Sequence, residues 1–174
     1  FIILSTTNEK ISLEDVAGKN GTLIMFICNH CPSVIHIRDS FVNFVSDYQE
    51  KGLAVVAISS NDIQTHPADS PKRMQEDSVT YKYSFPYLND ETQSVAKAYR
   101  ASCTPDFFLY DADRKLVYRG KYDDSSPGND EPVTGNDLRS AVESLLRGET
   151  ISGKQHPSVG CNIKWRIGEE PEYY

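Results

Sequence analysis

The stretch Thr22-Leu-Ile-Met-Phe-Ile-Cys28-Asn-His-Cys31-Pro32 decides the fold, because an apolar run ends there at two cysteines three residues apart. Residues 22–28 have the length and β-branched content of a buried strand. From Pro32 onward, apolar residues recur at helical spacing, which predicts a helix over residues 32–50. A helix that begins near Cys31 brings the two cysteines toward the roughly 5.5–6 Å Cα separation that a disulfide prefers. The sequence therefore predicts a reactive dithiol at a strand-to-helix junction.

The start of a helix favours a thiolate, because its unpaired N–H groups and the positive end of its dipole stabilise negative charge. We expect Cys28 to be the nucleophile, since it lies at the loop end of the turn and should be the more exposed thiol. Cys31 is then the resolving partner. His30 lies between the two cysteines; it either stabilises the neighbouring thiolate when protonated or is a solvated loop residue, and the sequence leaves both interpretations open.

The segments outward from this junction indicate an α/β fold. Residues 53–59 form a second apolar strand, so strand, helix and strand predict a parallel pair with a right-handed crossover. The remaining pattern predicts short strand and turn material near residues 1–16, helices over 70–83, 90–99 and 134–147, and a hairpin of 107–110 with 116–118. Residues 149–174 lack periodicity. We expect a domain over residues 1–148 and an extended tail over 149–174 that packs on the same domain.

The composition excludes several classes of function. A net charge of −7 over 174 residues argues against nucleic acid or an anionic membrane as a partner. No apolar run reaches the roughly 18 residues that span a bilayer. Four cysteines are too few to build a disulfide scaffold in a chain of this length. Because the sequence starts at Phe1 rather than methionine, both a cytoplasmic and an exported origin stay open, and the cytoplasm is favoured.

Five segments carry a resemblance to a known superfamily. They are Met25-Phe-Ile-Cys-Asn-His-Cys-Pro32, Phe85-Pro-Tyr-Leu88, Gln93-Ser-Val-Ala-Lys-Ala-Tyr99, Cys103-Thr-Pro-Asp-Phe-Phe-Leu109 and Pro157-Ser-Val-Gly-Cys-Asn-Ile-Lys-Trp165. The chain resembles the peroxiredoxin-related redoxins of the thioredoxin-like superfamily, the alkyl hydroperoxide reductase or thiol-specific antioxidant type, and within them a bacterial subfamily with a Cys-Asn-His-Cys-Pro motif. This resemblance implies a thioredoxin-like fold with a central mixed sheet flanked by helices. It also implies that Thr104 and Pro105 form a cis-proline position that faces the dithiol and binds substrate.

The peroxidase signature of that family is only partly present. Peroxiredoxins carry a Pro-x-x-x-Thr-x-x-Cys pattern, which on this chain places Cys31 at the reactive cysteine, Cys28 at the threonine and Ile24 at the proline. Arg100 could supply the arginine that aligns peroxide, or be a solvated helix-end residue. The two departures favour dithiol–disulfide exchange over peroxide reduction, and peroxidase activity stays an alternative.

A metal-binding module is the rival from another class. Thiolate and imidazole suit copper(I) or zinc, and His30 and His36 lie near the cysteine pair. Further ligands are weakly indicated, because His66 and His156 both precede prolines in loops. If the fold is right, Cys103 lies near the dithiol as a third redox thiol or a small buried residue, and Cys161 in the tail could pair with it.

We therefore predict a thiol–disulfide oxidoreductase that uses the Cys28/Cys31 pair, with His30 tuning the thiolate. Its expected substrate is a protein or small-molecule disulfide or dithiol. We expect no resident metal and no organic cofactor. The sequence leaves the electron donor, the direction of electron flow and the oligomeric state open.

Overall fold

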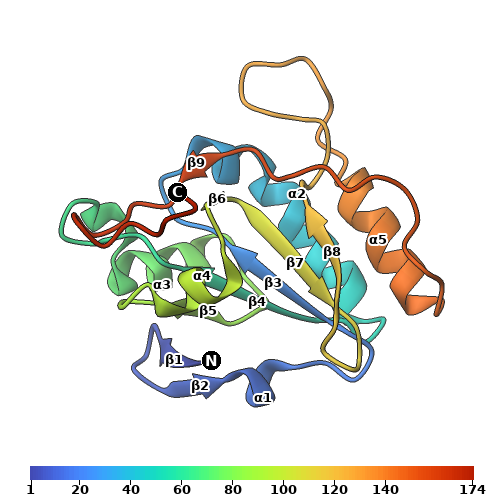
Figure 1. Ribbon diagram of the computed structural model, residues 1–174, viewed down its shortest axis with the longest axis horizontal. Helices are drawn as coiled ribbons and strands as arrows, with labels where there is room; N and C mark the ends of the chain where they lie inside the picture. The colour runs from blue at the N-terminus through green and yellow to red at the C-terminus, as the bar shows by residue number, and fades with distance from the viewer.

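The computed structural model describes residues 1–174, which fold around one seven-stranded mixed sheet with helices against it (Figure 1). The strand order is β2-β1-β5-β4-β3-β7-β8, and a separate two-stranded sheet joins β6 and β9. The strands are β1 (Ile2–Ser5), β2 (Lys10–Ser12), β3 (Thr22–Phe26), β4 (Ala54–Ser59), β5 (Tyr87–Asn89), β6 (Cys103–Thr104), β7 (Asp106–Tyr110), β8 (Leu116–Gly120) and β9 (Cys161–Asn162). The helices are α1 (Leu13–Val16), α2 (Pro32–Gln49), a 3₁₀ turn (Pro67–Asp69), α3 (Pro71–Thr80), α4 (Ser94–Tyr99) and α5 (Asn136–Leu146).

The centre of the sheet is the strand-helix-strand unit expected from the sequence. β3 and β4 pair in parallel, in a register from Thr22 opposite Ala54 to Phe26 opposite Ile58. β7 pairs antiparallel on the other side of β3, which makes the sheet mixed. Because β3 has neighbours on both edges and helices against it, all five of its residues are buried. The loop that carries the cysteine pair therefore starts at the end of a central strand.

Alternation along β3 divides the core into two layers, because successive side chains of a strand point to opposite faces. Leu23 and Met25 belong to a cluster with apolar residues of α2, α3 and α5. Ile24 and Phe26 belong to a second cluster with α4 and with Trp165 of the C-terminal segment.

None of the helices combines the length and the apolar content that a membrane crossing requires.

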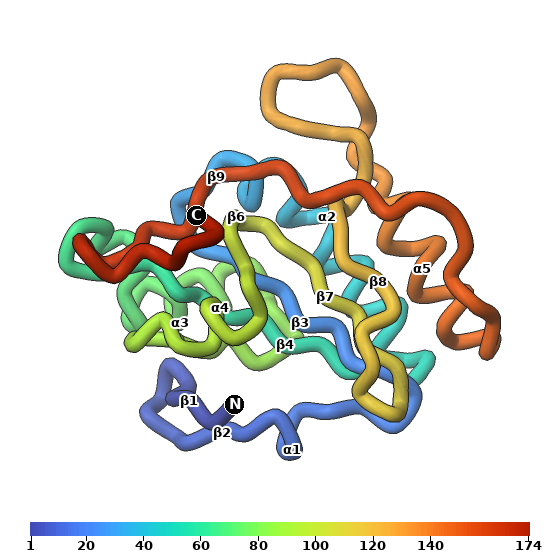
Figure 2. Tube along the Cα trace, viewed as in Figure 1, coloured from blue at the N-terminus to red at the C-terminus, as the bar shows by residue number.

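Two segments differ from the sequence prediction. Near the N-terminus the chain forms a helical turn, α1, since the Ser12 hydroxyl accepts a hydrogen bond from the Asp15 N–H and the Asp15 carboxylate accepts one from the Ser12 N–H. The segment after α5 contains a short strand, β9. It crosses the molecule from the end of α5 to β6, where β9 pairs with β6 (Figure 2).

Candidate active site

Cys31 lies at the start of α2, as the N-cap residue that precedes Pro32 at the first helical position. Proline suits that position because its fixed φ fits the helix and its missing N–H would be unpaired there in any case. The Cys31 carbonyl accepts the first backbone hydrogen bond of the helix, from Val34 (3.0 Å). Cys28 lies between β3 and this helix start. The Cys28 and Cys31 side chains are 2% and 0% exposed, and all four cysteines are free thiols.

The thiols of Cys28, Cys31 and Cys161 shift one another's pKa. The pKa of Cys31 lies well below that of an ordinary thiol, first because the Cys28 thiol donates a hydrogen bond to it and also because Cys161 hydrogen bonds to it. The pKa of Cys28 is raised, first by the same bond to Cys31, then by burial and by the charge of Asp69. The lowered pKa favours the thiolate at Cys31 over the thiolate at Cys28.

The sequence analysis assigned Cys28 the role of nucleophile because of its expected exposure. Neither residue is exposed, so exposure does not choose between the two thiols. The helix begins at Pro32, as expected, and Cys31 directly precedes it. A thiolate at that position is favoured by the unpaired N–H groups of the first turn.

Thr104 and Pro105, the residues expected at the substrate-binding position, lie against the dithiol. The Thr104 hydroxyl is 3.6 Å from the Cys28 sulfur, and the Thr104 carbonyl oxygen is 3.2 Å from the Cys31 sulfur. The peptide bond between Thr104 and Pro105 is cis. The protonated Cys31 thiol donates to the Thr104 carbonyl, and this bond opposes ionisation of Cys31. The neighbouring thiols of Cys28 and Cys161 favour its ionisation.

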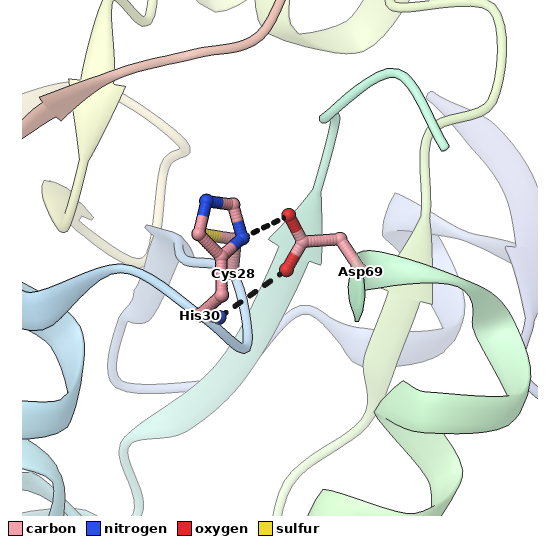
Figure 3. A group of neighbouring side chains, drawn as sticks. All are labelled: Cys28, His30 and Asp69. Atoms are coloured by element: carbon pink, nitrogen blue, oxygen red, sulfur yellow. Dashed lines mark hydrogen bonds and ion pairs between the residues drawn. The ribbon is translucent and has the colours of Figure 1, made fainter. Parts of the chain in front are cut away.

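His30 points toward Asp69, a residue that the sequence did not single out (Figure 3). The imidazole Nδ1 lies 2.6 Å from one carboxylate oxygen of Asp69, whose side chain is completely buried. The ring also stacks on the imidazole of His66, with centroids 5.3 Å apart. His30 is therefore held in place by two partners rather than free in solvent.

Asp69 also fixes the backbone between the two cysteines. Its Oδ1 accepts hydrogen bonds from the Asn29 N–H (2.8 Å) and from the His30 N–H (3.3 Å). Its Oδ2 accepts one from the Asn61 side-chain amide (2.8 Å). Cys28 and Asp69 are separated by 40 residues, and no sequence pattern links them, so only the fold brings them together.

The group that comes nearest to a metal site is Cys28, His30 and Asp69, whose candidate ligand atoms lie within 4.8 Å of one another. Both Asp69 oxygens already accept hydrogen bonds, and His36 and His156 are not part of the group. Three residues, one of them with both oxygens hydrogen bonded, make a poor fit to the four-ligand site that zinc prefers.

The two remaining cysteines differ in their surroundings. Burial raises the pKa of the Cys103 thiol to about 12, and its sulfur faces two backbone carbonyl oxygens. This environment is that of a small buried residue. Cys161 is partly exposed and contacts the Cys31 thiol, whose hydrogen bond together with burial raises the Cys161 pKa. The tail thus brings its cysteine to the dithiol.

A mixed sheet, a pair of cysteines at the start of a helix and a neighbouring threonine-proline strand define a thioredoxin-like redoxin. The sequence profile of the AhpC/TSA family matches residues 1–119. The chain belongs to the AhpC/TSA family.

Individual relatives agree with this assignment. Alkyl hydroperoxide reductase C of Helicobacter pylori is 27% identical over 94% of this chain and 79% of its own length. The thiol-disulfide oxidoreductase ResA of Bacillus cereus is 24% identical over 67% of this chain and 63% of its own length. A conserved protein of Geobacillus kaustophilus superposes with a TM-score of 0.94 and 49% identity, over 97% of this chain and 89% of that one. A thioredoxin-like protein of Aeropyrum pernix, 18% identical over 83% of this chain and 88% of that one, superposes with a TM-score of 0.62 and confirms the expected fold.

Proposed function

We propose that this redoxin is a thiol–disulfide oxidoreductase in which Cys31 is the attacking thiolate and Cys28 the resolving thiol. One observation supports this most strongly: both sulfurs lie against Thr104, and Cys31 directly precedes α2, where its pKa is lowered by the neighbouring Cys28 thiol. Thiolate is the form of cysteine that attacks disulfides, and a second thiol in contact with it can complete the exchange.

The exchange proceeds in two balanced steps. Cys31 thiolate attacks one sulfur of a substrate disulfide, which forms a mixed disulfide and releases the other substrate sulfur as a thiolate. Cys28 then loses its proton to that released thiolate or to water and attacks the Cys31 sulfur. This step forms the Cys28–Cys31 disulfide and releases the second substrate thiolate. The substrate disulfide is reduced by two electrons and the dithiol is oxidised, and a dithiol reductant reverses the change.

Asp69 and His30 act as positioning residues in this scheme. The Asp69 carboxylate binds the backbone N–H groups of Asn29 and His30, the two residues that connect the cysteines. Tyr87 adds a further restraint, because its hydroxyl donates to the Asn29 side-chain oxygen (2.9 Å). A connection held in this way keeps the two sulfurs in contact when the charge moves between them.

Trapping of the mixed disulfide tests the proposal. In Cys28→Ser the attack by Cys31 can occur but the resolving step cannot, so a small aromatic disulfide should leave a stable adduct that mass spectrometry maps to Cys31. Cys31→Ser should form no adduct at Cys28, and Cys103→Ser should behave as the wild type because its thiol is buried, faces backbone carbonyl oxygens and has a raised pKa. An adduct that maps to Cys28 in Cys31→Ser would show that the roles are wrong.

Peroxide reduction is a second candidate, favoured by the AhpC/TSA match and by the low pKa of Cys31. In that reaction Cys31 thiolate attacks one peroxide oxygen, the O–O bond breaks, and the other oxygen leaves and is protonated to water or an alcohol. Cys31 is then a sulfenic acid, and the Cys28 thiol condenses with it to form the disulfide and release water. Arg100, which the sequence left either as a peroxide-aligning arginine or as a solvated helix-end residue, lies with its guanidinium 4.8 Å from the centroid of the Tyr173 ring. Dimedone trapping after hydrogen peroxide addition decides between the candidates: rapid, Cys31-dependent labelling supports the peroxidase, and its absence supports exchange alone.

A further inference from the structure

The C-terminal segment around β9 covers the dithiol. Cys161 and Asn162 pair antiparallel with Thr104 and Cys103, and the Ile163 N–H donates to the Ser102 carbonyl (3.0 Å). This pairing places an extended backbone along the strand that faces the two thiols, with Cys161 opposite Thr104, whose carbonyl oxygen is 3.2 Å from the Cys31 sulfur. The segment therefore has the form of a bound cysteine-containing peptide.

Gly160 shows how closely this segment approaches its partner strand. A Cβ atom at this position would lie 2.0 Å from the Thr104 carbonyl oxygen and 3.2 Å from the Pro105 Cδ. The Thr104 oxygen is a backbone atom of β6 and the Pro105 Cδ is part of a proline ring, so neither atom can move without moving the backbone. Only glycine fits directly before the cysteine without displacing the strand.

The segment is held at both ends but loosely in the middle. Before it, the Ser158 hydroxyl donates to the Gly120 carbonyl (2.6 Å). After it, Ile163 and Trp165 are buried in the second core cluster. Between these anchors Val159 is 78% exposed and only two residues pair with β6. Such a segment can open locally without loss of the surrounding core.

We infer that residues 159–162 are a displaceable internal cover that occupies the place of an extended peptide whose reacting cysteine follows a glycine. This inference rests on the proposed function for the identity of the partner. Since Cys28 and Cys31 are 2% and 0% exposed, no disulfide reaches Cys31 until the cover opens. A partner strand then pairs with β6 in its place, as peptides add to exposed strand edges elsewhere.

Thiol labelling tests the cover without any redox assay. The reduced protein is treated with iodoacetamide, and mass spectrometry measures the alkylation rate of each cysteine. In Gly160→Ala the added methyl group must push the cover away from Thr104, so we expect Cys31 to react at least about tenfold faster than in the wild type. Val79→Ala, at an exposed position of α3 outside the cover, should leave the rate unchanged. Equal rates in Gly160→Ala and the wild type would overturn the inference.

A measurement on the wild type guards against a variant that simply unfolds. If the cover opens locally, the Cys31 alkylation rate should change little with low urea concentrations, since local opening exposes little surface. A rate that follows global unfolding across the same urea series would refute local opening. These readouts do not depend on exchange, so a protein that opens as expected yet reduces no disulfide would refute the proposed function alone.

Peptides test the partner chemistry. Mixed disulfides of Cys31 in Cys28→Ser should form faster with a Gly-Cys peptide disulfide than with a Val-Cys peptide of otherwise equal sequence, because only glycine fits beside the Thr104 carbonyl. Equal rates for the two peptides would show that the partner does not take the place of residues 159–162.

Discussion

Replacement of Asp69 by asparagine should destabilise the protein because it disturbs the hydrogen bonds that this carboxylate accepts beside the cysteine pair. An asparagine oxygen can keep the bonds from the Asn29 and His30 N–H groups, but its amide nitrogen then faces the Asn61 amide nitrogen at the 2.8 Å contact. Asn61 cannot turn over freely, because its oxygen accepts a bond from the Lys164 N–H (2.9 Å). One charge-assisted bond is lost, a buried donor is left unpaired and two bonds lose their charge assistance, which together cost about 3–4 kcal/mol.

Urea denaturation measures this loss directly as a change in the unfolding free energy at unchanged m-value. A loss of this size lowers the melting temperature by about 6–16 °C for a chain of this length. Asp130→Asn, in the exposed loop before α5, is the matched control and should change stability by less than about 0.5 kcal/mol. A loss below about 1 kcal/mol for Asp69→Asn would refute the view that this carboxylate holds the connection between the cysteines.

Two further predictions concern ionisation and a helix cap. Cys31 has a folded-state pKa below its unfolded value, so its contribution to stability is full above the unfolded thiol pKa and is lost as the pH falls. The stability advantage of the wild type over Cys31→Ser, measured by urea titration, should therefore grow between about pH 5 and about pH 8. A constant difference would contradict the low pKa. Asp90→Ala should cost about 2–3 kcal/mol by the same assay, because its buried carboxylate caps α4 through the Ala96 N–H (2.8 Å) and accepts the Ser60 hydroxyl (2.8 Å), whereas the exposed Glu91→Ala should be neutral.

The central architecture could be predicted from the sequence because local patterns specify it. The apolar runs of β3 and β4 and the helical spacing after Pro32 are strong signals, and all three elements form in the expected order. The hairpin of β7 and β8 and the helix α5 are likewise where their patterns indicate. Contacts between neighbours in the chain suffice for these predictions.

The site required information that no local pattern carries. Asp69 meets the Asn29–His30 connection only because the loop after β4 returns to the end of β3, and its own sequence context is that of an ordinary turn. The pairing of β9 with β6 joins two-residue strands, which are too short to show alternation. The expected exposure of Cys28 was wrong, because exposure depends on what the rest of the chain covers and not on the local sequence.

A redox titration of the dithiol tests the account most directly. The protein is equilibrated across a series of glutathione potentials, free thiols are trapped by alkylation, and mass spectrometry maps each disulfide. The account predicts one reversible two-electron transition in which Cys28 and Cys31 form an intramolecular disulfide, with Cys103 reduced throughout. A protein in which no Cys28–Cys31 disulfide forms at any potential would contradict it.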